Sequence, residues 1–353
     1  MKGKRMIKKA TMADIAEQLG ISKNSVSLAL RGKQGVSDEL RAKIAETATA
    51  LSYGNFYGRG DDKSRCILAI VPEYLQGDSF FYSDIFWAVE AESKLRGCIS
   101  IHIGISKEME ETGAMPSFPK EVTILGLIVI GVLRESYVEK LFSLGYPMLS
   151  VDIAYHAIPI GCVGSSNLNG GFAATKHLID NGHAKIGFIG PIFTAQSIYE
   201  RWCGYQLAMR VSGLYADDGY CVTGKTTAFQ LFDAPESFEC FLDEMGEFPT
   251  AWFCGGDRIA VALIQLLSKR GVRVPGDVSV IGFDDIPVAQ MIFPRLTTIR
   301  IDRKLMGRLA VSSLLDLSDQ SEMGKTNINI SGKLVVRESV KKLGAPEPPR
   351  PPE

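Results

Sequence analysis

The chain has 353 residues, 46% of them hydrophobic, a globular composition long enough for two or three domains with a large core. Its longest apolar stretch, residues 124–133, is too short to span a bilayer, and its basic N-terminus lacks the apolar run of a signal peptide, so we expect a cytoplasmic protein without a membrane partner. The net charge is only −1, but residues 1–65 hold thirteen Lys or Arg against seven Asp or Glu, so a segment of charge +6 precedes a remainder of charge −7.

The basic N-terminal segment predicts contact with nucleic acid, because neutralising phosphates supplies most of the non-specific affinity of DNA-binding proteins. The alternative is a solvated tail, which would account for five of the basic residues: Lys2, Lys4, Arg5, Lys8 and Lys9.

The pattern that follows the basic start predicts a short amphipathic helix. Thr11 is a side-chain cap with Asp14 three residues further on, and Gly20 ends the helix. The apolar residues of this stretch fall on one helical face: Ile15, Ala16 and Leu19.

A second helix is predicted directly after a tight turn. Ile21 fills the turn and Ser22 caps the helix. Three residues point inward, Val26, Ala29 and Leu30, whereas Lys23, Asn24 and Ser27 stay outside. This is helix-turn-helix geometry, in which the N-terminal residues of the second helix meet base edges in the major groove. Lysine can donate to guanine and asparagine can pair bidentately with adenine, so both Lys23 and Asn24 suit base recognition.

A third helix is predicted from a cap at Ser37, with acids in its first turn and apolar residues at core spacing: Leu40, Ile44, Ala48 and Leu51. Capped amphipathic helices also occur in α-rich domains of other function, so the motif alone stays a hypothesis.

Beyond residue 65 the chain alternates short β-rich runs with amphipathic stretches, which predicts βαβ units and mainly parallel sheets. Two successive doubly wound lobes account for this alternation of strands and helices. A small-molecule site is expected in the crevice between the lobes. The expected strands are 66–72, 99–105, 126–131, 148–151, 186–190, 251–254 and 278–283, and the expected helices are 82–96, 135–144, 169–181, 198–212 and 257–270.

The cysteines and histidines give no indication of a disulfide, a metal or another cofactor. Seven cysteines are scattered without a CxxC pair, and four histidines show no ligand spacing. We expect buried free thiols.

Short blocks of residues follow one another along the chain in an order typical of one family: residues 10–30 with 35–37, 167 with 170–171, 177–179 with 182–183, 186–190, 201 with 204–205, 249–251, 274–287, 296–299, 306–307 and 334–339. Each block is weak alone, but together they make the chain resemble a LacI-type bacterial transcriptional regulator over nearly its whole length. The resemblance implies an all-α helix-turn-helix headpiece (1–53), a hinge (54–65) and a two-lobe core like the periplasmic sugar-binding proteins (66–340). Residues 341–353 are expected to be a disordered Pro-rich tail.

The resemblance also implies functional residues. In the headpiece and hinge, the candidate DNA contacts are Ser22, Lys23, Asn24, Ser25, Ser27, Arg31, Asn55 and Arg59. In the core, Asp152, Arg201 and Asp284 match effector-contacting positions, and a guanidinium flanked by carboxylates suits the vicinal hydroxyls of a sugar. Aromatic residues that could stack on the effector are Phe80 and Phe81, with Tyr74 and Trp252 as further candidates. Taken alone, Asp152 could instead cap a turn, Asp284 or Asp285 could cap the helix that follows, and Arg201 could be a surface residue.

At three places the chain departs from the family pattern, and these departures limit which of the family's residue roles can be assigned to it. Leu28 stands where many relatives have an arginine after the second serine of the recognition helix. The hinge lacks the usual proline and has Asp61 where a leucine wedge would enter the minor groove, so we do not expect a stable hinge helix. Gly256 replaces a usual asparagine, which removes one polar group from the pocket and argues for an effector unlike those of the sugar-binding relatives.

The leading hypothesis is therefore a dimeric, operator-specific transcriptional regulator, a repressor, controlled by a small metabolite. The alternative is a solute-binding protein of the periplasmic type without a DNA function. An enzyme is not indicated, because no phosphate-binding loop, nucleophile elbow, Cys-His pair or metal cluster occurs.

Overall fold

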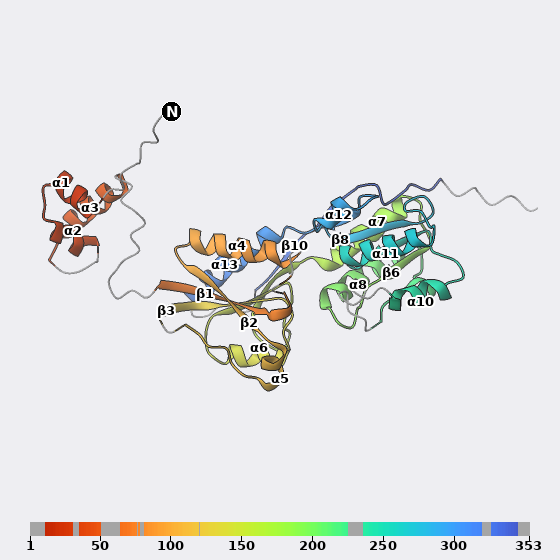
Figure 1. Cartoon of the computed structure of the whole chain (residues 1–353), viewed down its shortest axis with the longest axis horizontal. Helices are drawn as coiled ribbons and strands as arrows, with labels where there is room; N and C mark the ends of the chain where they lie inside the picture. Colours follow the sequence, from red (N-terminus) through yellow and green to blue (C-terminus); the bar gives the residue numbers. More distant parts are fainter. Residues whose placement is uncertain are drawn as a thin grey trace, which may run out of the picture. The chain divides into compact units, whose positions relative to one another are not determined.

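In the computed structural model the chain divides into two compact units, Met1–Ser64 and Arg65–Glu353, and each unit is described by itself. The structure describes residues 11–30, 35–50, 64–75, 77, 81–119, 121–224, 236–319 and 326–344 (Figure 1). Four candidate site residues lie outside the described residues: Arg31, Asn55, Arg59 and Phe80. The greater part of the predicted hinge and of the Pro-rich tail also lies outside them.

The N-terminal unit contains the three predicted helices: α1 (Met12–Leu19), α2 (Lys23–Leu30) and α3 (Asp38–Ala50). Thr11 and Asp14 form a capping box, in which the Asp14 amide donates to the Thr11 hydroxyl and the Asp14 carboxylate accepts from the Thr11 amide. Gly20 ends α1 at a φ of +64°, a left-handed conformation that glycine adopts without strain. The predicted beginning and end of this helix are confirmed.

The second and third helices are capped by serines and pack around a small apolar core. The Ser25 amide donates to Ser22 Oγ at 3.0 Å, and the Leu40 amide donates to Ser37 Oγ at 3.3 Å. The Arg41 guanidinium donates to the Ala29 carbonyl at 2.8 Å and ties α3 to the last turn of α2. The buried core consists of Ile15, Ala16, Val26, Ala29 and Ile44.

The described residues of the second unit form two sheets, and each sheet is the centre of a lobe (Figure 1). The first lobe has a six-stranded sheet in the order β10-β5-β4-β3-β1-β2, and its described pairings are parallel. The strands are β1 (Ser64–Pro72), β2 (Ile99–Ile105), β3 (Val122–Ile130), β4 (Met148–Val151), β5 (Gly161–Ser165) and β10 (Asn327–Ile330). Because β1 begins at Ser64, two residues that we assigned to the hinge belong to this strand.

The second lobe has a five-stranded sheet in the order β11-β9-β8-β7-β6, parallel except for β11. Its strands are β6 (Ile186–Ile189), β7 (Ala251–Cys254), β8 (Ser279–Asp284), β9 (Thr297–Arg300) and β11 (Lys333–Val335). The central strands are buried along their length, as expected for a parallel sheet that is covered on both faces.

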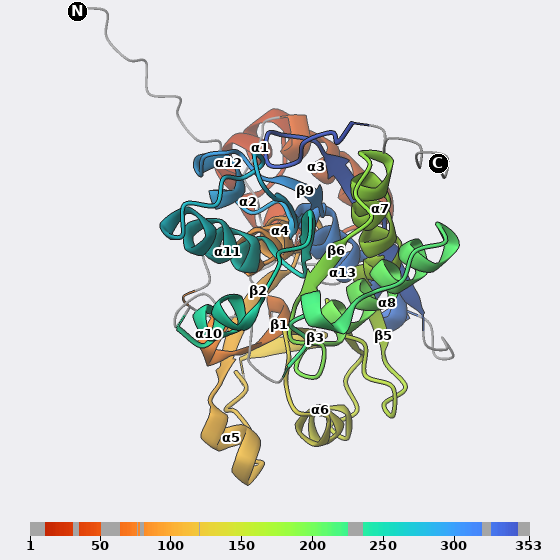
Figure 2. The ribbon, with the colours of Figure 1, turned by 90° about the vertical axis from the view of Figure 1, so that its right-hand side faces the viewer.

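Helices cover both faces of each sheet. In the first lobe, α4 (Tyr82–Leu95) and α13 (Arg303–Asp319) lie together on one face, and α5 (Lys107–Thr112) and α6 (Glu135–Phe142) lie on the opposite side (Figure 1). In the second lobe, α7 and α8 lie side by side and α11 covers the other face (Figure 2). The helices of this lobe are α7 (Asn167–Asp180), α8 (Gln196–Val211), α10 (Glu236–Glu244), α11 (Asp257–Lys269) and α12 (Val288–Met291). Among the described residues, none of the helices combines the length and the apolar character needed to cross a membrane.

The fold class is confirmed, but our expectation that the two lobes follow one another in the chain is wrong. Over the described residues the chain passes between the lobes after β5, again between β9 and α13, and a third time between β10 and β11. As a result α13 and β10, which follow most of the second lobe in sequence, complete the first lobe. Alternating hydrophobicity predicts a strand but does not show which sheet the strand joins.

The first residues of the predicted tail are bonded to the core. The Lys341 amide donates to Ser279 Oγ at 3.0 Å, and the Leu343 amide donates to the Asn181 carbonyl at 2.8 Å. The core therefore continues past the predicted limit at residue 340.

Candidate functional site

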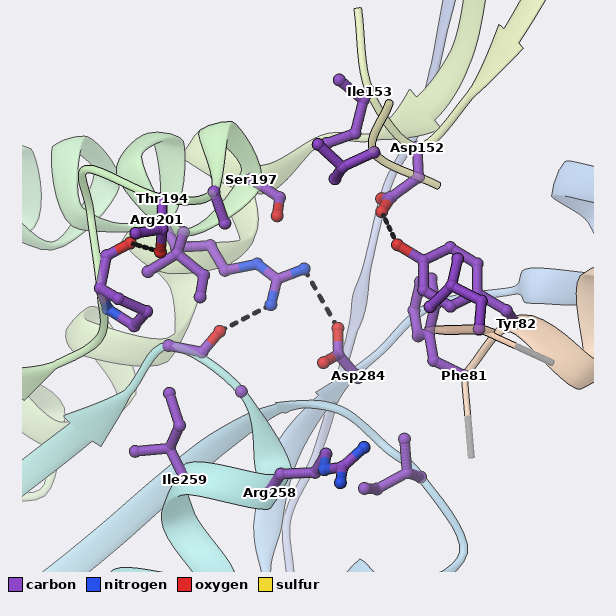
Figure 3. A pocket seen from close by; sticks show the side chains of 18 of the residues that line it. Phe81, Tyr82, Asp152, Ile153, Thr194, Ser197, Arg201, Arg258, Ile259 and Asp284 are labelled. Atoms are coloured by element: carbon purple, nitrogen blue, oxygen red, sulfur yellow. Dashed lines mark hydrogen bonds and ion pairs between the residues drawn. The ribbon is translucent and has the colours of Figure 1, made fainter. Parts of the chain in front are cut away.

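A cavity of about 390 Å³ lies between the two lobes, at the carboxyl ends of strands from both sheets (Figure 3). The carboxyl ends of parallel strands are the usual place for a ligand in such folds. The first lobe contributes Phe81, Tyr82 and Asp152, and the second contributes Arg201 and Asp284. We call this space the interlobe cavity.

Arg201, on α8, is buried at the centre of the site, with only 4% of its surface exposed. Its Nε donates to Asn167 Oδ1 at 3.0 Å, and one terminal nitrogen donates to the Gly255 carbonyl at 2.6 Å. The other terminal nitrogen lies 3.1 Å from Asp284 Oδ1, and the guanidinium stacks 3.8 Å above the centre of the Phe283 ring. A cation held from four sides has a fixed orientation, so Arg201 is preorganised.

Two glycines permit the close approach of α7 and α8 that positions Arg201. A Cβ on Gly171 would lie 2.3 Å from the Arg201 carbonyl oxygen, and one on Gly204 would lie 2.1 Å from the Leu168 carbonyl oxygen. Any larger residue would force these helices apart and move the guanidinium. The glycines of the predicted blocks therefore have a packing role next to the site.

Asp284 ends β8 with a φ of +105°, a conformation that costs free energy for a residue with a side chain. Its burial raises the pKa of the carboxyl to about 6, although the positive charges of Arg201 and Arg303 oppose that rise. The carboxylate is thus a poorly solvated acceptor that faces the cavity.

Asp152, just after β4, also has a positive φ, of +76°. Its Oδ2 accepts a hydrogen bond from the Tyr82 hydroxyl at 2.8 Å. Its Oδ1 is buried and has no hydrogen-bond partner among the described residues. Burial raises the pKa of this carboxyl, while the Tyr82 bond and Arg201 lower it. A buried acceptor without a partner is costly unless a ligand satisfies it.

Arg303 connects the two walls of the cavity. Its Nε donates to Asp84 Oδ2 of α4 at 3.0 Å, and a terminal nitrogen donates to the Asp284 carbonyl at 2.6 Å. The guanidinium also lies 5.7 Å from the centre of the Phe81 ring. The strained end of β8 in one lobe is therefore joined to the first turn of α4 in the other.

Four of the candidate effector contacts line this cavity: Phe81, Asp152, Arg201 and Asp284. Tyr74 lines it as well, but Trp252 does not. Trp252 is fully buried within the second lobe, where its indole N–H donates to the Tyr220 carbonyl at 3.2 Å. Its place in the centre of β7 required an apolar core residue rather than a ligand contact.

Five polar residues of the site were not among our candidates: Tyr82, Asn167, Thr194, Ser197 and Arg258. Asn167 was noted only as part of the family pattern, and it orients Arg201 from α7. Tyr82 follows Phe81 directly, so a search for hydroxyls beside the predicted aromatic pair would have found it. Gly256 also lines the cavity, and a Cβ there would lie 3.4 Å from Asp284 Oδ2.

Two further buried acids nearby have structural partners. Asp257 accepts from the Thr298 hydroxyl at 2.6 Å and from the Ile286 amide at 2.9 Å. Asp285 forms ion pairs of 2.6 Å with both Arg300 and Arg337. Of the adjacent acids 284 and 285, only the first is directed at the cavity.

The headpiece presents its candidate residues around the first turn of α2. Ser22, Lys23 and Asn24 are exposed, whereas Ser25 and Ser27 are half-buried. The hydroxyls of Ser22 and Ser25 lie 2.9 Å apart. The free ends of the Lys23 and Asn24 side chains can reach an external surface without any change in the packing of the headpiece.

Within the described part of the chain, no group of three or more His, Cys, Asp or Glu side chains is arranged to hold a metal ion. The six cysteines whose state is described there are free thiols.

Comparison with known proteins assigns both units. Residues 11–54 match the family described as bacterial regulatory proteins, lacI family, and residues 175–340 match the periplasmic binding protein-like domain. The chain belongs to the LacI family of bacterial regulatory proteins.

The likeness of this LacI-family chain to its relatives extends over nearly its whole length. It is 28% identical over 348 residues to the transcriptional repressor CytR of Escherichia coli, covering 97% of this chain and all of CytR. It is 25% identical over 338 residues to the repressor PurR of Mannheimia succiniciproducens, covering 95% and 99%. The lac repressor dimer bound to operator and an anti-inducer has the same fold, with a TM-score of 0.67, 22% identity and coverage of 95% and 100%.

The match of a helix-turn-helix to residues 11–54, together with repressors that align from end to end, shows that this LacI-family protein is a DNA-binding transcriptional regulator. The alternative of a solute-binding protein without a DNA function is set aside, because that alternative gives no reason for the N-terminal unit.

Proposed function

We propose that the protein is a homodimeric repressor that binds a two-fold symmetric operator and whose affinity for it is set by a small metabolite in the interlobe cavity. The protein acts in the cytoplasm, where it reaches DNA, and it acts by binding rather than by catalysis. Relatives named as repressors and a structural neighbour captured as a dimer on its operator support the proposal.

The headpiece provides sequence recognition in this proposal. Lys23 and Asn24 contact base edges, and Ser22, Ser25 and Ser27 contact backbone phosphates or adjacent bases. Arg31, Asn55 and Arg59 extend the contact toward the hinge. The exposure of Lys23 and Asn24 at the N-terminus of α2 supports these roles.

One observation carries the effector part of the proposal: Asp152, whose buried Oδ1 has no hydrogen-bond partner among the described residues, lines a cavity in which Arg201 and Asp284 are already oriented. Such an arrangement satisfies its acceptor only when a ligand with a hydrogen-bond donor is present. Phe81 provides aromatic surface in the same cavity, and Phe80, which lies outside the described residues, is proposed as a second aromatic contact of the effector.

The dimer uses exposed apolar residues of the second unit. On α4 of the first lobe, Trp87 is 70% exposed and Leu95 is 80% exposed. At the end of α12 in the second lobe, Met291 and Phe293 are 82% and 93% exposed. Because α4 and α12 lie along the same side of the two lobes (Figure 1), one symmetric contact could cover both groups.

Rotation of the lobes links the two binding events. A metabolite held by residues of both lobes changes the angle between them, and the dimer converts this change into a different spacing of the headpieces. The link through Arg303 between Asp284 and α4 supports this route, because α4 also carries Trp87 of the proposed dimer contact.

Selection of bound sequences from a random duplex pool, with purified full-length protein at near-physiological salt, tests the DNA part. Recovery of an inverted repeat is the expected result. Recovery of no motif, with binding that disappears as the salt concentration rises, would reject operator recognition. The small-molecule fraction of a bacterial extract is then added to the complex, and a change in operator affinity is expected only with an intact cavity.

The variant Gly256→Trp supplies the matching control for the cavity. The φ of Gly256 is extended and leaves the position open to any residue, so the indole fills the cavity from one side. We expect unchanged operator binding and loss of the response to the extract. A response as large as that of the wild type would place the effector elsewhere.

A further inference from the structure

Leu28 is a large apolar residue of the headpiece that does not pack against the described headpiece core. That core consists of the five buried residues named above and of partly buried residues packed against them, and Leu28 belongs to neither group. The partly buried members are Met12, Leu19, Ile21, Val36 and Leu40. Leu28 itself is half-buried. The packing of the described headpiece therefore does not explain why this position holds an apolar side chain.

Helix geometry directs Leu28 to the outer side of α2. Val26 and Ala29 define the side of α2 that faces the core. Because successive residues of an α-helix are about 100° apart, Leu28 lies about 130° around the helix from the middle of that side. It lies only about 40° from Asn24, which is one turn earlier. Leu28 and Asn24 therefore point in nearly the same direction.

Four residues form the outer side of α2: Lys23, Asn24, Ser27 and Leu28. Lys23 and Asn24 are exposed, and Ser27 and Leu28, one turn further along, are half-buried. We call these four residues the recognition face. Three of them carry hydrogen-bonding groups, whereas Leu28 presents methyl groups. The recognition face thus combines polar groups with one apolar group, and the apolar group lies one turn after Asn24.

The nearest part of the following loop leaves one flank of Leu28 uncovered. A Cβ on Gly35 would lie 3.8 Å from Leu28 Cδ1, which is van der Waals contact. Gly35 is exposed and has no side chain, so it does not cover this methyl group as a larger residue would. Leu28 therefore keeps apolar surface that a partner of α2 can reach.

The major groove of DNA offers one kind of apolar group to such a side chain. Base edges in this groove present hydrogen-bond donors and acceptors, and the 5-methyl group of thymine is the apolar exception. A leucine side chain neither donates nor accepts a hydrogen bond, so it gains free energy at a base edge by removing this methyl group from water. Burial of one such group changes the affinity about fourfold.

We infer that Leu28 is a specificity-determining residue that reads the 5-methyl group of a thymine in each operator half-site. The inference rests on the proposed base contacts of Lys23 and Asn24, and it adds one base pair to the sequence that they recognise. Asn24 and Leu28 are about 6 Å apart along the helix axis, and successive base pairs are about 3.4 Å apart. The thymine is therefore expected one or two base pairs from the base that Asn24 contacts.

Removal of single methyl groups from the operator tests the inference. Each thymine of the operator recovered by sequence selection is replaced in turn by uracil, which lacks the 5-methyl group and keeps every hydrogen-bonding atom. We expect one position in each half-site at which the affinity of the full-length protein falls about fourfold, and about a fifteenfold loss when both half-sites are changed. At this position 5-methylcytosine should bind more tightly than cytosine, because it restores the methyl group.

Variants of Leu28 assign the effect to this side chain. Leu28→Ala shortens the side chain, so its affinity for the thymine and uracil operators should be equal at that position. Leu28→Met keeps a long apolar side chain and should retain at least about a twofold preference for thymine. Alanine and methionine are both good helix formers, so α2 is preserved in both variants. Lys43→Ala, exposed on α3, is the control and should keep the preference of the wild type.

Three outcomes would overturn the inference. The first is a wild-type affinity that no replacement of thymine by uracil lowers. The second is a uracil effect of the same size in Leu28→Ala, because another side chain would then read the methyl group. The third applies if Leu28→Ala binds neither operator, and it is equal affinity of Leu28→Met for thymine and uracil operators. In all three cases a recovered inverted repeat still supports operator recognition, which fails, together with this inference, only when selection recovers no motif.

Discussion

The headpiece and the two-lobe core present their functional residues in opposite ways. In the headpiece, the described candidate DNA contacts (residues 22–25 and 27) are neighbours in sequence around the first turn of α2, where Ser22, Lys23 and Asn24 are exposed, and the apolar core holds that turn in place. In the core, the residues around the interlobe cavity come from positions as far apart as Phe81 and Asp284, and the central ones are buried.

The two kinds of site differ in how much their functional residues affect the free energy of folding. An exposed lysine or asparagine is solvated before it meets DNA, so its presence hardly affects folding. A buried arginine or aspartate must be paired within the fold, because an isolated buried charge is strongly destabilising. Substitutions in the cleft should therefore alter both stability and function, whereas substitutions on α2 should alter function alone.

Replacement of Arg201 should give the largest effect. Arg201→Met keeps most of the side-chain volume but leaves Asp284, the Asn167 amide oxygen and the Gly255 carbonyl without their cation. We expect the free energy of unfolding, measured by urea denaturation, to fall by about 3–5 kcal/mol, and any response to an effector to disappear. Arg210→Met, at an exposed position of the same helix, is the control. Equal stability of the two variants would contradict the buried network.

Replacement of Lys23 or Asn24 should leave stability unchanged and alter recognition. Lys23→Ala or Asn24→Ala is expected to reduce the preference for operator over random DNA by about 1–3 kcal/mol, because each removes contacts to a base edge. Competitive binding titrations with both DNAs measure this difference. Lys43→Ala, exposed on α3, serves as the control. A loss of equal size on both DNAs would make these residues phosphate contacts.

The buried acid Asp284 should make the stability of the core depend on pH. Its pKa is raised to about 6 in the folded protein from 3.8, so the folded state holds a proton that the unfolded state releases between these values. Stability from this group is present below about pH 4 and is lost as the pH rises through 6, at up to about 1.4 kcal/mol per pH unit. Denaturation of the wild type and of Asp284→Asn across pH 4–7 should show a steeper fall of stability in the wild type, because the variant retains only the other buried acids, such as Asp152, whose pKa burial also raises. Parallel curves would mean that the proton is bound elsewhere.

The capping box of α1 gives the smallest expected effect. Thr11→Ala removes the hydroxyl that accepts from the Asp14 amide, and it should destabilise the headpiece by about 1 kcal/mol. Amide hydrogen exchange in residues 12–19 measures the change without interference from the core. Thr47→Ala is the control, because its hydroxyl donates only to the Lys43 carbonyl within α3. Faster exchange after the control substitution alone would contradict the cap.

The headpiece could be predicted almost completely from its sequence because its determinants are local. Thr11, Gly20, Ser22 and Ser37 act on helix ends within three residues of themselves, and the apolar positions follow the helical period. In the core, the same kind of pattern located strands that are long or strongly apolar, such as β2 and β7. It missed β5, whose sequence Gly-Cys-Val-Gly-Ser has two glycines, and β10, where asparagines alternate with isoleucines.

The cleft was predictable only in part. Arg201 and Asp284 were found through the family pattern, since nothing in their immediate sequence shows that 82 intervening residues fold back to bring them to 3.1 Å. Trp252 was a wrong candidate because residue type cannot distinguish a ligand contact from the centre of a sheet. The pairing of β10 with β5 had no local indication at all, because it requires the chain to return to the first lobe after most of the second lobe is complete.

The return of α13 and β10 to the first lobe also limits how such a protein can change by recombination. The headpiece is joined to the core by one stretch of chain, so a single junction suffices to exchange it for another. Exchange of one lobe would need a junction at each of the three passages between the lobes, and truncation before β10 would remove an edge strand from the first lobe. DNA specificity can therefore be replaced as a module, whereas a new effector specificity has to arise within the existing core by substitution of individual residues.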